Sequence, residues 1–341
     1  MEVLRYKPEI VSIDSPLGLP RGRCCTKDSC GCRANGILRE CERILWRRGV
    51  RVYPCLLPSM QGLTTRGIRI AARLRARGVA VIESYPGAAQ DIMRIPRKRA
   101  SLLDLASGLR AFGVSLAERD GVTHDELDAV TAAIVGLFFW SGRFEALGHE
   151  DEEQLIVPGR EMDPSCLART VIGLSGPISA GKTTVARRLE ERGYSYARFS
   201  EVLADLLKAE GVPTTRETLQ VLGERVHRDP GQRWLCRQLF MRLPKTGDIV
   251  VDGLRHPEDH GFFVERFGPA FRHIHLEAPT SLRRERYVRL GHDGSDFDAA
   301  SEHSVEQHID SMALLAHRVV ESTQGVDAVV SRVMAAAKEL H

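Results

Sequence analysis

The segment GPISAGKTT, residues 176–184, decides how the second half of this chain folds. It fits the pattern G-x-x-x-x-G-K-[ST], and it stands between the apolar segment VIGL and a helical pattern that begins near Thr183. Glycines at these positions let backbone N–H groups and the helix N-terminus face an anion, while the lysine reaches outer phosphates and the threonine hydroxyl binds Mg²⁺. We therefore expect a binding loop for ATP and Mg²⁺, made by Gly176, Ser179, Ala180, Gly181, Lys182, Thr183 and Thr184. A glycine-rich turn with a surface lysine is the weaker alternative.

The composition indicates a globular chain with two domains. Of the 341 residues, 43% are hydrophobic and 27% are charged, which suits about two domains of ~150 residues each. The formal charge of +3 is far from the basic excess expected of a protein that acts mainly on nucleic acid. No apolar run approaches the ~20 residues of a membrane helix, and the N-terminus lacks a secretory signal pattern. These features predict a cytoplasmic protein without a membrane partner.

Residues 156–170 form the expected boundary between the two halves. The hydrophobic periodicity is lost there, and two prolines and a glycine occur. We predict domains at 1–158 and 170–341, joined by a linker at 159–169. In the second domain, the apolar segments TVIGL, YSYARF, DIVVD, FRHIHLE and HRVVE alternate with amphipathic stretches. This alternation predicts an α/β fold with a five-stranded parallel sheet that helices cover.

Asp252 ends the apolar segment DIVVD, at the edge where parallel sheets bind ligands, and Arg255 follows it closely. The carboxylate can hold Mg²⁺, and the guanidinium can bind a phosphate. The run Asp252-Gly253-Leu254-Arg255 resembles the D-G-F-P-R segment of adenylate kinases, in the nucleoside monophosphate kinase superfamily, although it lacks the proline. A strand-ending aspartate that caps the next helix is the alternative.

Three arginines of LRRERYVRLGHDGSD, namely Arg283, Arg286 and Arg289, recur every third residue and fall on a common side of a predicted helix. Cations so close together repel one another unless an anion joins them. In the kinases that this region resembles, such arginines form a lid over the transferred phosphate. The resemblance implies a catalytic set of Lys182, Asp252, Arg255, Arg286 and Arg289. A solvated basic helix face is the alternative, chiefly for Arg283.

The order of these segments over residues 170–341 is most similar to dephospho-CoA kinase and the deoxynucleoside monophosphate kinases. The resemblance implies a P-loop kinase fold that transfers a phosphoryl group from Mg-ATP to a nucleotide or nucleotide-like small molecule. Ser200, Arg216 and Gln220 lie where such kinases bind the acceptor. A switch GTPase is disfavoured, because the sequence has no N-K-x-D run.

Four acidic residues of the first half stand at strand ends or in the first turn of a helix: Asp14, Glu83, Asp125 and Asp128. If the segments EIVSID and VAVIES are parallel neighbours, these carboxylates can converge and hold divalent metal. Two Mg²⁺ ions in such a cluster would activate water for phosphodiester cleavage. Carboxylates that cap helices and face solvent are the alternative.

The runs SIDSPLGLP, IESYPGAAQDI and THDELDAVTAAIVG resemble the predicted RNase H-like nucleases grouped as domain of unknown function 429, over residues 8–158. The resemblance implies an RNase H-like α/β domain with a nuclease metal site at these carboxylates. That fold begins with a strand that carries its own metal-binding aspartate, followed by two more strands, whereas about a dozen residues precede Asp14 here. The resemblance thus implies a truncated domain with an incomplete metal site, or a start that lies upstream.

The run CCTKDSCGC contains Cys25, Cys30 and Cys32, which could bind Zn²⁺ together with Cys24 or Cys41. The spacing is not C-x-x-C, and a loop of free thiols is the alternative.

The basic runs RGRCC and IPRKRAS could contact a nucleic acid backbone, with scattered surface charge as the alternative. The first functional hypothesis is a small-molecule kinase fused to an RNase H-like domain. The second is an ATP-sensing C-terminal domain that regulates a nuclease in the N-terminal half, and the third is a scaffold in which both sites are degenerate.

Overall fold

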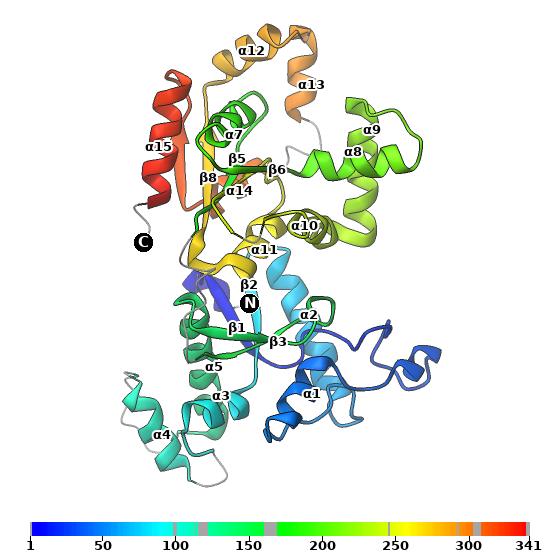
Figure 1. Cartoon of the computed structure of the whole chain (residues 1–341), viewed down its shortest axis with the longest axis vertical. Coiled ribbons are helices and arrows are strands. Elements are labelled where there is room, and N and C mark those ends of the chain that lie inside the picture. The colour runs from blue at the N-terminus through cyan, green and yellow to red at the C-terminus, as the bar shows by residue number, and fades with distance from the viewer. Residues whose placement is uncertain are drawn as a thin grey trace. The chain divides into compact units, whose positions relative to one another are not determined.

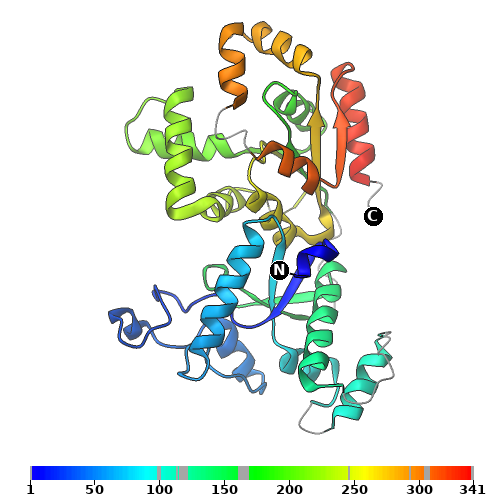
Figure 2. The ribbon, with the colours of Figure 1, turned by 180° about the vertical axis from the view of Figure 1, so that it is seen from behind.

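The computed structural model describes residues 2–97, 101–112, 114, 122–159, 169–244, 246–291, 293–302 and 308–338. The chain divides into two compact units, unit 1 (Met1–Arg75 and Val79–Asp163) and unit 2 (Ala76–Gly78 and Pro164–His341). Each unit contains its own sheet, which Figure 1 and Figure 2 show from opposite sides. The change from one unit to the other at 163/164 falls inside the proposed linker 159–169. Most of that linker lies outside the described residues, so its structure stays a prediction.

Unit 2 is built on the five-stranded parallel sheet that the sequence predicts. The strands are β5 (Val171–Ser175), β6 (Ser195–Arg198), β7 (Ile249–Asp252), β8 (Phe271–Glu277) and β9 (Arg318–Glu321), in the spatial order β6-β7-β5-β8-β9. All residues of β5 and β7 are buried, which explains why these two strands are continuous apolar runs. Because the strands run in one direction, the segments that follow β5, β6 and β7 meet at one edge of the sheet.

Helices cover both faces of this sheet. The helices α7 (Lys182–Glu190) and α15 (Val326–Lys338) share a buried cluster with Ile274 and Leu276 of β8. Alternate residues of β8 point the other way, where Phe271 stacks on Phe263 of α11 (Pro257–Phe267) with 5.4 Å between ring centroids. The helix α14 (Ile309–Leu315) packs against α11 and β8.

Two helical arms stand at the carboxyl edge of the sheet of unit 2, as Figure 1 shows. One arm consists of α8 (Phe199–Ala209), α9 (Arg216–Val226), the π-helical segment η4 (His227–Gly231) and α10 (Gln232–Phe240). The other arm consists of α12 (Thr280–Arg289), the short 3-10 helix η6 (Gly294–Asp296) and α13 (Phe297–Glu302). A further 3-10 helix, η5 (Gly268–Ala270), connects α11 to β8. Residues of both arms and of the loop after β5 line one cavity at this end of the sheet.

Unit 1 has a mixed sheet. Among its described residues, β1 (Ile10–Asp14), β2 (Ala80–Ser84) and β4 (Leu155–Pro158) are parallel, β3 (Phe144–Leu147) is antiparallel to β4, and the order is β1-β2-β4-β3. The segments EIVSID and VAVIES are parallel neighbours, which was the condition for their carboxylates to converge. Its helical segments are η1 (Glu2–Tyr6), η2 (Gly31–Asn35), α1 (Glu40–Arg47), α2 (Gln61–Arg75), α3 (Pro86–Met93), α4 (Leu102–Ala111), α5 (His124–Trp140) and η3 (Glu150–Glu152).

The two faces of the sheet of unit 1 are covered by different helices. Val81 packs with Leu74 of α2, whereas its neighbour Ile82 packs with Val135 of α5. Consecutive residues of β2 therefore point to opposite faces, as the pleat requires. In the described part of the chain, no helix is both long and apolar enough to cross a membrane.

Candidate active site

The loop between β5 and α7 turns tightly at the end of the central strand. Gly176 has φ 141° and Gly181 has φ 100°, which are backbone angles that favour glycine. A Cβ atom on Gly176 would lie 2.3 Å from the carbonyl oxygen of Leu276, so that only glycine fits beside β8. Gly181 is the N-cap of α7, and the first-turn amides of this helix follow directly. The loop thus has the backbone geometry of a phosphate-binding site.

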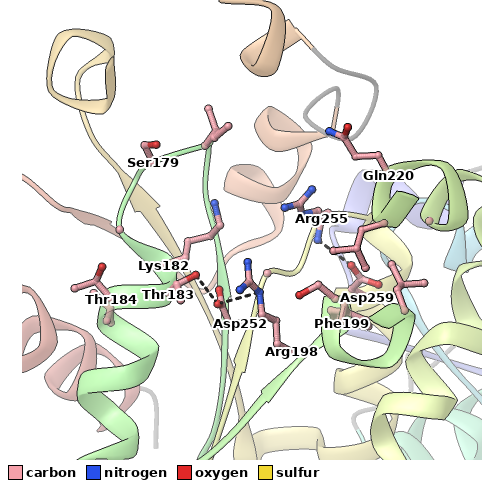
Figure 3. Close-up of a pocket in the computed structure, with 18 of the residues that line it drawn as sticks. Ser179, Lys182, Thr183, Thr184, Arg198, Phe199, Gln220, Asp252, Arg255 and Asp259 are labelled. Atoms are coloured by element: carbon pink, nitrogen blue, oxygen red, sulfur yellow. Dashed lines mark hydrogen bonds and ion pairs between the residues drawn. The ribbon is translucent and has the colours of Figure 1, made fainter. Parts of the chain in front are cut away.

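Lys182 folds back over this loop, as Figure 3 shows. Its Nζ atom donates to the carbonyl oxygens of Gly176 at 2.5 Å and Pro177 at 2.8 Å. Phosphate oxygens can replace these carbonyl oxygens as partners, because they are stronger acceptors for an ammonium group. The lysine charge is therefore already held at the place where the outer phosphates of a nucleotide would bind.

Thr183 and Asp252 form the next part of the site. Thr183 Oγ1 donates to Asp252 Oδ2 at 2.7 Å (Figure 3). The hydroxyl group of Tyr196 donates to the same oxygen at 3.1 Å. Arg198 lies 3.6 Å from that oxygen through Nε. Burial, and then the charge of Asp252, raises the pKa of Tyr196, so that its phenol stays protonated and donates. Asp252 is 1% exposed, so these partners surround a buried carboxylate.

Asp252 does not cap the following helix. The N-cap of α11 is His256, and Asp259 completes its capping box. The Oδ2 atom of Asp259 accepts the backbone N–H groups of Arg255 at 2.8 Å and His256 at 2.9 Å. Its other oxygen accepts from the side chain of Gln232 at 2.6 Å. Asp259 therefore fixes the backbone of the segment after β7. The side chain of Arg255 points into the site (Figure 3). Its guanidinium makes no hydrogen bond or ion pair with a described residue.

The arginines of α12 differ in their contacts with the loop. Arg286 donates to the carbonyl oxygen of Ser322 at 2.6 Å and to that of Ala180 at 3.4 Å. Burial, and then the charge of Arg289, lowers the pKa of Arg286. Arg289 is exposed and pairs with Glu285 at 2.5 Å. Arg283, for which a solvated helix face was the alternative, donates to the loop carbonyl oxygen of Ile178 at 3.4 Å.

These groups open into one cavity of about 1220 Å³ within unit 2. Apolar side chains of α8 and α9 form one wall, and residues of α12 form another. Ser200 and Gln220 line the cavity as expected, whereas the side chain of Arg216 lies outside the described part. The predicted residues among its lining are Ser179, Gly181, Lys182, Thr183, Thr184, Asp252, Arg255, Arg286 and Arg289. The volume lies above the ~300–1,000 Å³ of a typical pocket for one small ligand.

Sequence reasoning missed Tyr196, Arg198 and Asp259. Arg198 ends β6 directly opposite Asp252, which ends β7. The sequence shows that Arg198 is a charged residue at the end of a predicted strand. Its place beside Asp252 could be predicted only with the knowledge that β6 is the neighbour of β7. Asp259 could not be singled out from the sequence, because acidic residues are common in the first turn of helices.

The four carboxylates of unit 1 do not form one metal cluster. In the register of β1 and β2, Glu83 lies opposite Ile13 and Asp14 lies opposite Ser84, so the two acidic residues point to different faces. Glu83 is occupied by Arg39, whose Nη1 and Nη2 atoms lie 2.7 and 2.6 Å from its two oxygens. The expected convergence of Asp14 and Glu83 was therefore wrong, because the pleat separates them and Glu83 serves a buried ion pair.

Asp125 and Asp128 do come together. Their carboxylates and the ring of His124 have ligand atoms within 4.8 Å of one another, at the start of α5. Among the described residues, no such group contains Asp14 or Glu83. Asp128 also accepts from Gln90 at 3.2 Å. The nuclease role of these residues stays a prediction.

The basic runs of unit 1 are largely engaged within the unit. Arg21 pairs with Asp151 at 2.8 Å, and Arg97 pairs with Asp91 at 2.5 Å. Residues 98–100 of the second run lie outside the described residues. The expected nucleic acid partner stays a prediction. The cysteine cluster is treated separately below.

Comparison with known proteins identifies relatives of the second half of the chain. Residues 172–307 match the AAA domain family AAA_18. A UPF0200 protein of Pyrobaculum aerophilum is 28% identical over 131 residues, which are 38% of this chain and 70% of that protein. A dephospho-CoA kinase of Carboxydothermus hydrogenoformans is 30% identical over 95 residues, which are 27% of this chain and 45% of that enzyme.

Among solved structures, the shikimate kinase of Acinetobacter baumannii in complex with shikimate is similar to this chain, with a TM-score of 0.34 and 18% identity. The match covers 48% of this chain and 90% of the kinase. The protein thus contains a P-loop, kinase-like α/β domain with UPF0200 and dephospho-CoA kinase homologues. The RNase H-like resemblance of residues 8–158 stays a prediction.

Proposed function

We propose that unit 2 transfers the terminal phosphoryl group of Mg-ATP to a nucleotide or nucleotide-like small molecule. The observation that carries this proposal is the 2.7 Å hydrogen bond between Thr183 and Asp252 at the end of the sheet, beside the lysine of the loop. It places a hydroxyl group and a carboxylate together, and these are the oxygen donors that Mg²⁺ takes in P-loop enzymes. The dephospho-CoA kinase relative supports a phosphotransferase.

The residues present fit Mg-ATP. Gly176 and Gly181 leave the loop free of side chains where backbone amides face an anion, since a Cβ on Gly176 would collide with β8. Thr183 and Asp252 would hold Mg²⁺, which neutralises charge on the outer phosphates when it is bound. Lys182 would exchange its two carbonyl partners for phosphate oxygens. Arg286, tied to both Ser322 and the loop, would keep positive charge beside the transferred group.

The acceptor would bind on the side of the cavity formed by α8, α9 and the segment after β7. Arg255 presents an unengaged guanidinium there, which suits a phosphate or another anionic group. Phe199, Leu203 and Leu219 line the same cavity and suit a flat apolar group such as a nucleobase. An anionic end and an apolar end in one acceptor describe a nucleotide-like molecule.

The architecture favours transfer over hydrolysis. Transfer requires the acceptor oxygen in line with the phosphorus atom and requires water to be excluded. The cavity has room for a second ligand beside the nucleotide, and α12 forms a wall that Arg283 and Arg286 attach to the phosphate loop. A site for hydrolysis alone would not need the additional volume.

The test is ADP release from Mg-ATP by the full-length chain, measured with a panel of acceptors. The panel contains dephospho-CoA, nucleoside monophosphates and deoxynucleoside monophosphates. We expect release that depends on one class of acceptor and falls at least ~100-fold in Lys182→Ala, because the main cation on the outer phosphates is lost. The matched control is Lys208→Ala, since Lys208 is an exposed lysine at the end of α8 that does not line the cavity.

Two results would contradict the proposal. One is ADP release at the same rate with and without every acceptor, which would indicate hydrolysis. The other is full activity of Lys182→Ala, which would show that the loop does not hold the transferred phosphate.

A further inference from the structure

Unit 1 carries four thiols that the kinase site does not use. Cys24, Cys25, Cys30 and Cys32 lie in one loop, residues 21–36, and their Sγ atoms all lie within 4.8 Å of one another. The Sγ atoms of Cys24 and Cys30 are 3.7 Å apart, and those of Cys25 and Cys32 are 3.8 Å apart. We propose that these four cysteines bind one structural Zn²⁺ ion.

The spacing of the sulfur atoms is the one that a tetrahedral zinc site requires. Four Zn–S bonds of ~2.3 Å that point to the corners of a tetrahedron place neighbouring sulfur atoms ~3.8 Å apart. The two measured pairs, at 3.7 and 3.8 Å, agree with that edge length. A disulfide would instead bring two sulfur atoms to ~2.05 Å. Four sulfur ligands also close the coordination shell, which is typical of structural zinc and leaves no position for a substrate.

The loop has no apolar core that could order it. Its sequence is RGRCCTKDSCGCRANG, in which Ala34 and the cysteines are the only apolar side chains. All of this loop is described, and Arg23 is its only buried residue. Small segments without a hydrophobic core need a disulfide or a metal to hold one conformation. A zinc ion that joins both arms of the loop supplies such a crosslink.

Side-chain hydrogen bonds to backbone carbonyl oxygens shape the loop around the sulfur atoms. The guanidinium of Arg23 donates to the carbonyl oxygens of Cys25 and Lys27, both at 3.2 Å. The side-chain amide of Asn35 donates to the carbonyl oxygen of Gly22 at 2.8 Å, which ties the end of the loop to its start. The four thiols therefore belong to a preorganised frame, and metal binding needs little rearrangement.

The structure also decides between the two candidates for the fourth ligand. Cys41 lies in α1, where it is buried and packs in an apolar cluster with Leu45. Cys24 instead joins the group of Cys25, Cys30 and Cys32. The sequence spacing is unusual, with two adjacent cysteines followed by a C-x-C pair. It still brings the four sulfur atoms together, because Cys24 lies beside Cys30 and Cys25 lies beside Cys32.

The first test is metal analysis of the full-length chain, purified without chelators. We expect about one zinc ion per chain, which a mercurial reagent releases to a chromogenic zinc indicator. Cys24→Ser and Cys32→Ser should each lose most of the zinc. The matched control is Cys55→Ser, because the Cys55 thiol lies outside the cluster and donates to the carbonyl oxygen of Ile37 at 3.4 Å. This variant should keep its zinc.

A second test uses the unmodified protein, in case a cysteine variant fails to fold. The zinc-loaded chain should resist trypsin at the exposed residues Lys27 and Arg33, and chelation should open both sites to cleavage. Replacement of zinc by Co²⁺ should give the thiolate charge-transfer absorption of a four-sulfur site. Three results would overturn the proposal: no zinc after incubation with the metal, iron in its place, or loss of the four thiols as two disulfides.

Discussion

Asp259 holds the segment after β7, and its replacement by asparagine should both destabilise unit 2 and loosen the acceptor site. The side chain is fully buried. One oxygen accepts the N–H groups of Arg255 at 2.8 Å and His256 at 2.9 Å, and the other accepts from Gln232 at 2.6 Å and Cys236 at 3.2 Å. Asparagine offers one acceptor oxygen and one amide donor in place of two acceptors. Gln232 can turn its own amide to match, but the Cys236 thiol loses its acceptor.

The magnitude follows from these bonds. Hydrogen bonds to a charged group contribute ~1.5–3 kcal/mol each, and neutral ones contribute ~1 kcal/mol. The two bonds to backbone N–H groups therefore weaken by ~1 kcal/mol each, and the bond from the thiol is lost. For Asp259→Asn we expect the free energy of unfolding of unit 2 to fall by ~3 kcal/mol. The KM for the acceptor should rise, because the backbone of Arg255 is held less firmly without the Asp259 carboxylate. The KM for ATP should change little, because the bonds of Asp259 do not reach the phosphate loop.

The assay is urea unfolding followed by tryptophan fluorescence, in a Trp46→Phe, Trp140→Phe background. The remaining tryptophan, Trp234, lies in α10 and reports on unit 2 alone. The control is Asp327→Asn, because this carboxylate is 68% exposed and should change the free energy by less than ~1 kcal/mol. If Asp259→Asn costs less than ~1 kcal/mol and leaves the acceptor KM unchanged, Asp259 does not position Arg255.

Three further changes test other parts of unit 2. Asp252→Asn should lower kcat at least ~100-fold and shift the Mg²⁺ dependence of ADP release, since a metal ligand is lost; an unshifted Mg²⁺ titration would argue against that role. Arg286→Ala should slow transfer far more than Arg289→Ala, because Arg286 contacts the loop whereas Arg289 is 74% exposed; the reverse ranking in steady-state assays would show that the lid acts through Arg289. Unit 2 should also lose stability in acid. Burial, and then neighbouring positive charge, lowers the pKa of four histidines: His260 to about 3, His275 and His317 to about 4, and His273 well below its ordinary value. The pKa values of these histidines in the folded protein lie below the value of ~6.5 in the unfolded chain, so the unfolded chain binds more protons in acid. The stability that the neutral histidines contribute is therefore fully present above pH ~6.5 and is lost as the pH falls towards 4. Each histidine contributes up to ~1.4 kcal/mol per pH unit, and equal urea midpoints at pH 7 and pH 5 would contradict this expectation.

Much of unit 2 could be predicted from short stretches of sequence. The phosphate loop is recognisable because glycine at positive φ, a lysine and a hydroxyl residue must follow a buried strand within a few residues. The five strands are recognisable because each is an apolar run between helical patterns. These requirements are local, so they are visible before any neighbour in space is known. Thr183 and Asp252, by contrast, are 69 residues apart in the sequence and meet because β5 and β7 are neighbours in the sheet.

The rest depended on which elements become neighbours in space. Arg198 and Asp252 face each other only because β6 pairs with β7, and Asp14 and Glu83 separate only because the register puts them on opposite faces. Sequence alone indicated a phosphate loop within a parallel sheet in the second half and four closely spaced cysteines in the first half. It placed four acidic residues at strand ends and in the first turn of a helix, but it did not determine which of them meet. Only the tertiary structure decided which of these side chains meet, because strand order, register and the pleat bring together residues that are distant along the chain.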